Sequence, residues 1–245
     1  MHEPRTYRHS VQSDGLVSFS VTVKETDLFI LAGQPLEKVT LESVLRHRGY
    51  LERFISLHPD FAVSLAPWPY AGAMPEIVRD MIGAGEIAGV GPMAAVAGAV
   101  AERVGTDLLL HSKEVIIENG GDVFIKTGYP VTVGVFAGKS PLSLKIGLKV
   151  QSENRSIAVC TSSGTVGPSL SFGRADAVCV VSASCPLADA AATAIGNRVL
   201  SRSDIARGIE FGKTIRGVDG VVIILGDRIG VWGELELVPL KGKKA

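Results

Sequence analysis

The sequence predicts an α+β fold in which antiparallel sheets pack against two helices rich in small residues. Three observations support this class: runs with strand-like alternation, segments with apolar residues at helical spacing, and an internal repeat that combines both. With 245 residues and 46% hydrophobic content, the chain is long enough to bury a substantial core. We therefore expect a single domain over residues 1–245, built from two related halves.

Local periodicity predicts the first elements. Leu16 to Val23 alternates between apolar and polar residues, and Asp27 to Leu31 is its expected hairpin partner. Residues 36–57 carry apolar side chains at helical spacing. Prolines and aromatic residues indicate a loop over residues 67–75, and residues 75–81 then indicate a short helix. The glycines that follow favour a loop; they are Gly83, Gly85, Gly89 and Gly91.

Charge and hydropathy restrict the classes of partner. The chain has 25 basic and 25 acidic residues, so no general electrostatic attraction to nucleic acid or to an anionic membrane is expected. Residues 82–100 are almost uncharged, but Pro92 and several glycines interrupt them, and we predict no membrane span. The first ten residues lack the apolar region of a secretory signal, so the cytoplasm is the expected compartment. Glycine- and alanine-rich surfaces permit a homodimer without requiring one.

An internal repeat gives the most information about the architecture. The ten residues from Gly91 align with the ten from Cys185, and each segment places a proline in the first helical turn before a run of small residues. A similar strand-turn-strand pattern with Gly-Asp in its turn follows each helix, at residues 115–125 and 222–231. We therefore expect the two small-residue helices to lie side by side.

The repeat also marks a candidate metal site. Asp189 and Thr193 are four residues apart, so their oxygens lie on one face of the predicted helix and can be ligands of Mg²⁺. The alternative is that Asp189 only stabilises the free amides at the start of its own helix. The equivalent positions of the first helix are Ala95 and Ala99, so only one copy carries these oxygens.

Two further segments are candidates for ligand binding. The first is a turn whose paired glycines leave backbone amides open to an anion or to the edge of a heterocycle, although a plain hairpin turn has the same composition. It consists of Asn119, Gly120, Gly121 and Asp122. The second is rich in hydroxyl groups suited to phosphate or ribose, and consists of Thr161, Ser162, Ser163 and Gly164. Neither a P-loop nor a serine-hydrolase motif is present, and the three cysteines are expected to be buried.

The three segments resemble motifs of the ApbE-like superfamily, whose best studied members are FAD-dependent protein FMN transferases. Glu118-Asn-Gly-Gly-Asp122 is similar to their Asn-x-Gly-Gly-Asp motif. Ser156-Ile-Ala-Val-Cys-Thr-Ser-Ser-Gly164 is similar to Ser-Ile-Ala-Thr-Ser-Gly, and Ala188-Asp-Ala-Ala-Ala-Thr-Ala194 to Ala-Asp-Ala-Leu-Ala-Thr-Ala. The motifs occur in the family's order, and the chain most resembles an uncharacterised cytosolic branch.

The resemblance implies a duplicated T-fold-like architecture with FAD or FMN in a cleft. Asp189 and Thr193 would help to bind Mg²⁺, and the other two motifs would line the flavin and its phosphates. The reaction would be the transfer of FMN from FAD to an acceptor hydroxyl with release of AMP. The transferases carry a histidine after the Ser-Gly motif, where this chain has Pro168, so the catalytic residue is not identified.

We therefore expect a protein that binds a flavin or a related nucleotide, with Mg²⁺-dependent transferase activity if it is an enzyme. Two alternatives use the same cleft. One is a carrier or sensor that binds the nucleotide without reaction. The other is an enzyme that acts on a purine or pterin held by a buried acid such as Glu118 or Asp122.

Overall fold

The computed structural model describes residues 15–69, 71–152, 155–166 and 171–240. Its centre is an eight-stranded sheet in which every neighbouring pair is antiparallel, in the order β1-β2-β3-β4-β7-β8-β9-β10. The strands are β1 (Val17–Val23), β2 (Thr26–Ala32), β3 (Val115–Asn119), β4 (Asp122–Lys126), β7 (Ile157–Ser162), β8 (Ala177–Ser182), β9 (Val218–Leu225) and β10 (Arg228–Gly233). The three predicted hairpins are confirmed: β1–β2, β3–β4 and β9–β10.

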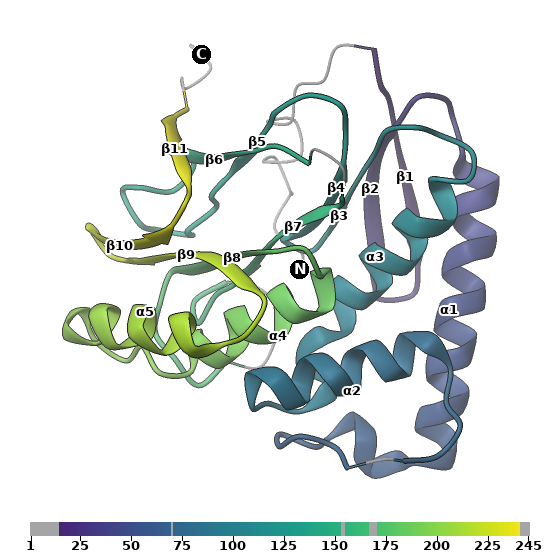
Figure 1. Ribbon diagram of the computed structural model, residues 1–245, viewed down its shortest axis with the longest axis horizontal. Helices are drawn as coiled ribbons and strands as arrows, with labels where there is room; N and C mark the ends of the chain where they lie inside the picture. The colour runs from purple at the N-terminus through teal and green to yellow at the C-terminus, as the bar shows by residue number, and fades with distance from the viewer. Residues whose placement is uncertain (1–14, 70, 153–154, 167–170, 241–245) are drawn as a thin grey trace.

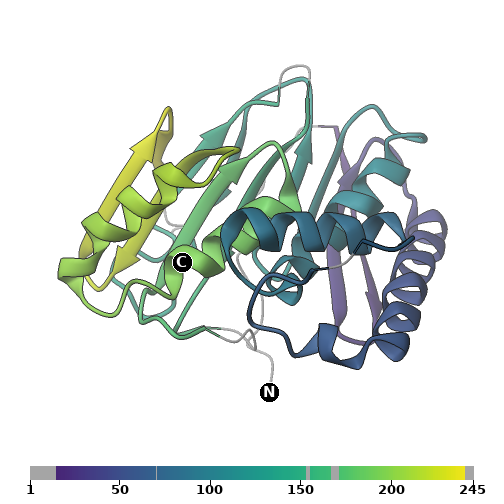
Figure 2. The ribbon, with the colours of Figure 1, turned by 60° about the horizontal axis from the view of Figure 1, so that its bottom comes forward.

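The large sheet separates the helices from a smaller sheet (Figures 1 and 2). The smaller sheet has the order β11-β6-β5 and consists of β5 (Val131–Gly134), β6 (Ile146–Val150) and β11 (Glu236–Pro239). The helices gather on the opposite face and are α1 (Glu37–Leu57), α2 (Glu76–Ala88), α3 (Val96–Leu108), α4 (Cys185–Gly196) and α5 (Ile205–Thr214). The predicted helix at residues 36–57 is confirmed by α1.

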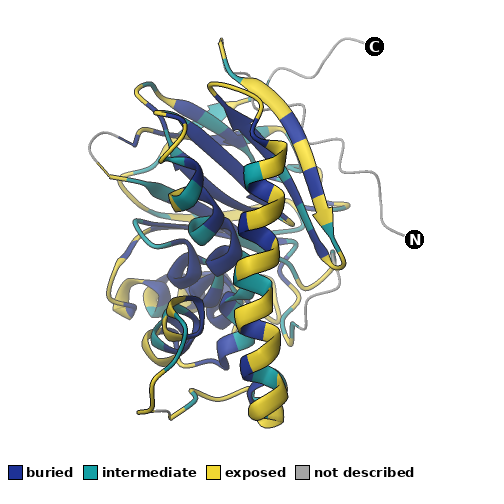
Figure 3. Cartoon of the chain, turned by 90° about the vertical axis from the view of Figure 1, so that its right-hand side faces the viewer, coloured by how far each residue is buried: buried dark blue, intermediate teal, exposed yellow. Residues whose placement is uncertain are grey.

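Strand alternation divides the core into two layers. Side chains of successive residues point to opposite faces of a sheet, so Ile117 and Phe124 pack with the helices whereas Ile116 and Ile125 pack with the smaller sheet. Figure 3 shows the buried strands behind the largely exposed outer face of α1. Because both faces of the central strands are covered, they read as continuous apolar runs rather than alternating ones.

The two helices of the repeat lie side by side, as the sequence predicts. A short 3₁₀ helix, Pro92–Ala95, leads into α3, and Pro186 occupies the first turn of α4. The helices approach so closely that a Cβ atom at Gly98 would lie 2.4 Å from the carbonyl oxygen of Cys185. Only a glycine allows this approach.

The prediction of a loop after residue 81 is wrong for Gly83 and Gly85. Helix α2 continues to Ala88 and ends at Gly89, whose φ of 74° is the left-handed conformation that favours glycine at a helix end. Gly85 lies within this helix, and the position needs a glycine because a Cβ atom there would lie 2.8 Å from the carbonyl oxygen of Val90. Close packing thus overrides the low helical propensity of glycine.

The nearly uncharged residues 82–100 divide between two helical segments. Within the described part of the chain, no single helix is long and apolar enough to cross a membrane. The helical segments Glu76–Ala88 and Pro92–Leu108 reach the required length and composition only together, and the chain bends by 106° between them.

The contact at Gly98 makes a testable prediction about stability. Gly98→Ala should lower the free energy of unfolding by about 1–3 kcal/mol, because the added methyl group forces α3 and α4 apart. Urea denaturation measured by circular dichroism gives this difference.

Gly83→Ala is the matched control, since it makes the same substitution within a helix where, in the described part of the chain, no atom outside the local helix backbone lies within 4 Å of the added Cβ. It should raise the free energy of unfolding by about 0.5–1 kcal/mol, because alanine has the higher helical propensity. Equal effects of the two substitutions would show that the close approach at Gly98 does not matter.

Candidate functional site

Helix α4 carries one polar stripe on an otherwise buried surface. Its N-terminus is fixed by Ser184, whose Oγ accepts a hydrogen bond from the amide of Leu187, and by Glu102 of α3, whose Oε2 accepts one from the amide of Cys185 at 2.6 Å. Every residue of α4 is buried except Asp189 and Thr193, which are partly exposed. These are the two positions that the sequence identifies as candidate metal ligands.

Asp189 caps the neighbouring helix rather than its own. Its Oδ2 accepts a hydrogen bond from the amide of Gly98 at 3.0 Å. Gly98 lies in the first turn of α3, where backbone amides have no partner within the helix, and the N-cap residue Ala95 offers no side-chain acceptor. The alternative interpretation was that Asp189 stabilises the start of its own helix. The structure instead shows Asp189 of α4 as a cap for α3.

The sheet brings two further polar side chains to the same helices. Asn119 and Asp122 face each other across the β3–β4 turn, and both are buried. The Asn119 side-chain amide donates to the carbonyl oxygen of Ala97 at 2.9 Å. Among the residues that the structure describes, the buried Oδ1 atom of Asp122 has no hydrogen-bond partner. An unpaired buried oxygen of this kind is costly unless it carries a proton or meets a ligand.

Burial disfavours the charged forms of both aspartates, and the charge of Asp189 adds to this effect at Asp122. Burial raises the pKa of Asp189 to about 7, against the opposing effect of the amides of Gly98 and Ala97. Burial, followed by the nearby charge of Asp189, raises the pKa of Asp122 well above its ordinary value. A divalent cation between these carboxylates would favour both charged forms.

The candidate residues from the second motif divide between the two faces of the sheet. Ser162 points toward the helices, and the Thr193 hydroxyl lies 3.5 Å from its Oγ. Thr161, one position earlier, points the other way, and its hydroxyl lies 3.1 Å from the Sγ of Cys179. Alternation along β7 therefore places Ser162 beside α4 but not Thr161.

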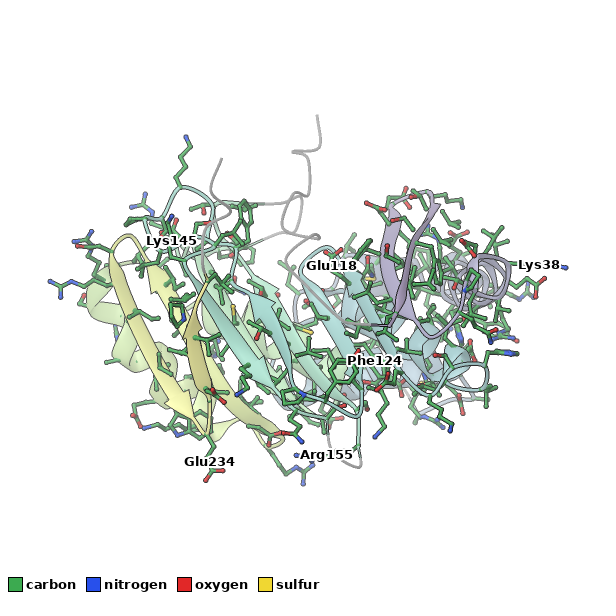
Figure 4. All side chains as sticks on the ribbon, turned by 90° about the horizontal axis from the view of Figure 1, so that it is seen from above. Lys38, Glu118, Phe124, Lys145, Arg155 and Glu234 are labelled. Atoms are coloured by element: carbon green, nitrogen blue, oxygen red, sulfur yellow. The ribbon has the colours of Figure 1, made fainter. Side chains whose placement is uncertain are left out.

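The glycine turn is less open than the sequence suggests. Gly120 and Gly121 adopt φ values of 68° and 108°, as a turn of paired glycines requires. The amide of Gly121, however, donates to Oε1 of Glu118 at 2.9 Å, so it is not free for a ligand. Glu118 itself belongs to the face away from the helices, onto which Figure 4 looks.

Ser163 and Gly164 form a turn that is held by its own side chain. Oγ of Ser163 accepts hydrogen bonds from the amides of Thr165 and Val166. Gly164 packs against Gly173: a Cβ atom added at Gly164 would lie 2.3 Å from the carbonyl oxygen of Gly173. The structure thus gives these residues a role in shaping the loop beside Ser162.

The cysteines are enclosed in the core, and His47 and His111 contact residues outside α4. Cys160, Cys179 and Cys185 are buried, as predicted, and burial raises the pKa of each thiol. His47 is bonded to Asp107 on the helical side, and His111 lies beside Gln34 at the far end of β2. Pro168 lies outside the described residues.

Two contributors escape the motif analysis. Gly98 supplies the amide that Asp189 binds, and nothing in the sequence indicates this pairing across 91 positions. Asn197 follows Asp189 and Thr193 at the same spacing of four, and it too is partly exposed. The spacing of four residues along the helix is the signal that would have identified Asn197.

The arrangement supplies hard oxygen ligands and hydrogen-bond donors at one place. The carboxylates of Asp189 and Asp122 and the hydroxyl of Thr193 are suited to Mg²⁺. Within the described ranges, no group of three or more His, Cys, Asp or Glu side chains is arranged to hold a metal ion. Any Mg²⁺ held here would therefore need oxygens from a bound ligand such as a phosphate, which is how Mg²⁺ sites are commonly completed.

Sequence comparisons identify close relatives. The model of the family described as AbpE bacteria matches residues 8–237. A UPF0280 protein from Methanocella arvoryzae is 42% identical over 214 residues, which is 87% of each chain. A UPF0280 protein from Methanococcus vannielii is 39% identical over 235 residues, 94% of this chain and 95% of the relative.

Solved structures share the fold at low sequence identity. The ApbE protein from Thermotoga maritima aligns with a TM-score of 0.56 and 15% identity, over 89% of this chain and 97% of that one. The flavinyl transferase ApbE from Pseudomonas stutzeri aligns with a TM-score of 0.54 and 13% identity, over 89% and 93%. These alignments confirm the predicted α+β class and the resemblance to the ApbE fold.

The raised pKa of Asp189 predicts how stability depends on pH. The ordinary pKa of this group is 3.8 and burial raises it to about 7 in the folded protein, so the folded state holds the proton more tightly between these values. The free energy of unfolding should therefore fall as the pH rises from about 4 to about 7. In Asp189→Asn, which can still cap α3, that fall should be smaller by about 2–4 kcal/mol.

Urea denaturation of both proteins from pH 4 to pH 8 measures this difference, and subtracting the two curves removes the contributions of groups that do not interact with Asp189. Asp60→Asn is a control with the same change at an exposed position, and its curve should run parallel to that of the wild type. A parallel curve for Asp189→Asn would mean that Asp189 is charged throughout.

Proposed function

Because this chain belongs to the AbpE bacteria family, we propose that it binds a flavin nucleotide, FAD or FMN, together with Mg²⁺ along the polar stripe of α4. The observation that carries the proposal is the position of Asp189 and Thr193, the partly exposed polar residues of a helix that is otherwise buried. Similarity to flavin transferases of known structure, which shows the fold, supports a flavin as the class of ligand.

The donor atoms fit a magnesium ion that is shared with a phosphate. Asp189 has one carboxylate oxygen on the amide of Gly98, and Asp122 presents the buried Oδ1 that lacks a hydrogen bond. Mg²⁺ prefers such oxygens and is commonly held by one or two carboxylates plus phosphate oxygens. When bound, the ion would neutralise the charge of the nucleotide's phosphates and polarise the bond between them.

The protein's own groups would orient the nucleotide. The Gly98 amide fixes the direction of the Asp189 carboxylate, and Asn119 fixes the adjacent backbone at Ala97. The hydroxyl groups of Thr193 and Ser162 lie side by side and can donate to phosphate or ribose oxygens.

We further propose, on the resemblance to FAD-dependent protein FMN transferases, that the bound FAD is a substrate. An acceptor hydroxyl would form a bond to the phosphorus on the flavin side while the bond to the bridging oxygen breaks. AMP would leave with the bridging oxygen, and the acceptor's proton would pass to solvent or to a site carboxylate.

Binding without reaction is the second candidate. The described histidines contact residues outside α4: His47 is bonded to Asp107, the ring of His58 lies 4.5 Å from that of Phe54, and the carbonyl oxygen of His111 accepts a hydrogen bond from Gln34. The related transferases use a histidine, so this arrangement favours a carrier or sensor in which the nucleotide stays intact.

Thermal unfolding tests the proposed binding. FAD or FMN with Mg²⁺ should raise the midpoint by about 5–10 °C at a hundredfold excess over Kd, because a ligand that binds only the folded state stabilises it. Chelation by EDTA should remove most of the shift, and so should Asp189→Asn, which keeps the cap on α3 but removes the charge.

Thr193→Val and Thr106→Val form a matched pair. Thr106 lies on the exposed side of α3 and its hydroxyl donates to the carbonyl oxygen of Glu102. Thr106→Val should therefore leave the shift unchanged, while Thr193→Val reduces it. No shift with either flavin would refute the proposal and turn attention to purines and pterins. Chromatography of AMP after incubation with FAD and an acceptor then separates a transferase, which releases AMP, from a carrier, which does not.

A further inference from the structure

The polar stripe of α4 extends beyond the two candidate metal ligands. Asp189, Thr193 and Asn197 follow one another at intervals of four residues, so they lie along one face of the helix over about 12 Å. All three are partly exposed whereas the helical residues between them are buried. Asn197 therefore marks the far end of the surface along which a nucleotide would lie.

The far end of the stripe is joined to a second segment, residues 171–174. The side-chain oxygen of Asn197 accepts a hydrogen bond from the amide of Phe172 at 2.9 Å. The amide of Arg174 donates to the carbonyl oxygen of Val199 at 2.8 Å. These bonds on either side of Gly173 fix the backbone of the segment against the end of α4.

Close glycine contacts fix this segment further. A Cβ atom at Gly173 would lie 1.9 Å from the carbonyl oxygen of Gly196, and one at Gly164 would lie 2.3 Å from the carbonyl oxygen of Gly173. Three backbone segments are thus stacked without side chains between them. The stack connects the turn after Ser162 to the end of α4 through Gly173.

Phe172 is an exposed aromatic residue on this rigid backbone. It is 56% exposed even though its amide is bonded to Asn197. A large apolar ring that is left open to solvent on a fixed backbone is typical of a ligand-binding surface. The nearby cation of Arg198 lies instead over the ring of Phe211, 3.6 Å from its centroid, so it does not cover Phe172.

We propose that Phe172 is the stacking platform for the planar heteroaromatic ring of the bound nucleotide, while its phosphate and metal lie at Asp189 and Thr193. The inference rests on the proposed function and assigns the ring to one end of the stripe. Stacking on a phenyl ring is available to any flat heterocycle, so Phe172 supplies affinity and Asn197 fixes the position of the platform.

Two substitutions at Phe172 test the assignment. Phe172→Leu keeps an apolar side chain but removes the ring, and should weaken FAD binding about tenfold. Binding of inorganic pyrophosphate with Mg²⁺, measured by the same calorimetric titration, should not change because pyrophosphate has no ring. Phe172→Trp should retain FAD and quench its fluorescence on binding more strongly than the wild type does.

Tyr50→Leu, at an exposed aromatic on α1, is the control and should leave FAD binding unchanged. Unchanged FAD affinity in Phe172→Leu would overturn the platform while leaving flavin binding intact. Equal losses for FAD and pyrophosphate would also overturn it, because they would indicate a general disturbance of the site. Failure of the wild-type protein to bind any flavin would overturn the proposed function as well, so the two failures are distinguishable.

Discussion

The bond between the carboxylate of Asp189 and the amide of Gly98 holds the two central helices in register. It requires the absence of a side chain at Gly98, because a Cβ there would lie 3.0 Å from that of Asp189. It also satisfies an amide that α3 cannot satisfy by itself, since Ala95 provides no cap. The favourable interaction of a carboxylate with a helix N-terminus offsets part of the cost of burying the charge. The position of the polar stripe on α4 follows from this contact.

The antiparallel sheet then decides which motif residues meet the stripe. Because side chains alternate, β3, β4 and β7 each send every second residue to the helical side. Asn119, Asp122 and Ser162 reach α4 or α3, whereas Thr161 and Glu118 face the other layer. A motif that is continuous in sequence is therefore divided in space. A one-residue change of register would exchange the two sets.

The fold was largely predictable because its signals are local. The β3–β4 and β9–β10 turns carry Gly-Asp between apolar runs, and residues 36–57 show helical periodicity over their whole length. The repeat also gave the pairing of α3 with α4. The error at Gly85 has a tertiary cause, since glycine propensity indicates a loop but the close approach to Val90 requires glycine within the helix; Gly83, which has no such contact, lies in the same helix. In the candidate site, the residue types on α4 were predictable, whereas the cap on Gly98 and the bond of Asn119 to Ala97 depend on contacts between distant segments.

The site therefore combines two opposing demands on the same carboxylate. As a cap, Asp189 is most effective when charged, since the free amides of α3 attract an anion. Among the buried side chains of α4, it is less costly when it carries a proton, and burial raises its pKa to about 7. A bound cation satisfies both demands at once, because it allows both carboxylates to be charged without removing the cap. The Oδ1 atom of Asp122, which has no hydrogen-bond partner, is the part of this arrangement that the fold itself does not satisfy. The packing of α3 against α4 thus places, beside an open polar stripe, a pair of acids whose charged forms favour the binding of a cation.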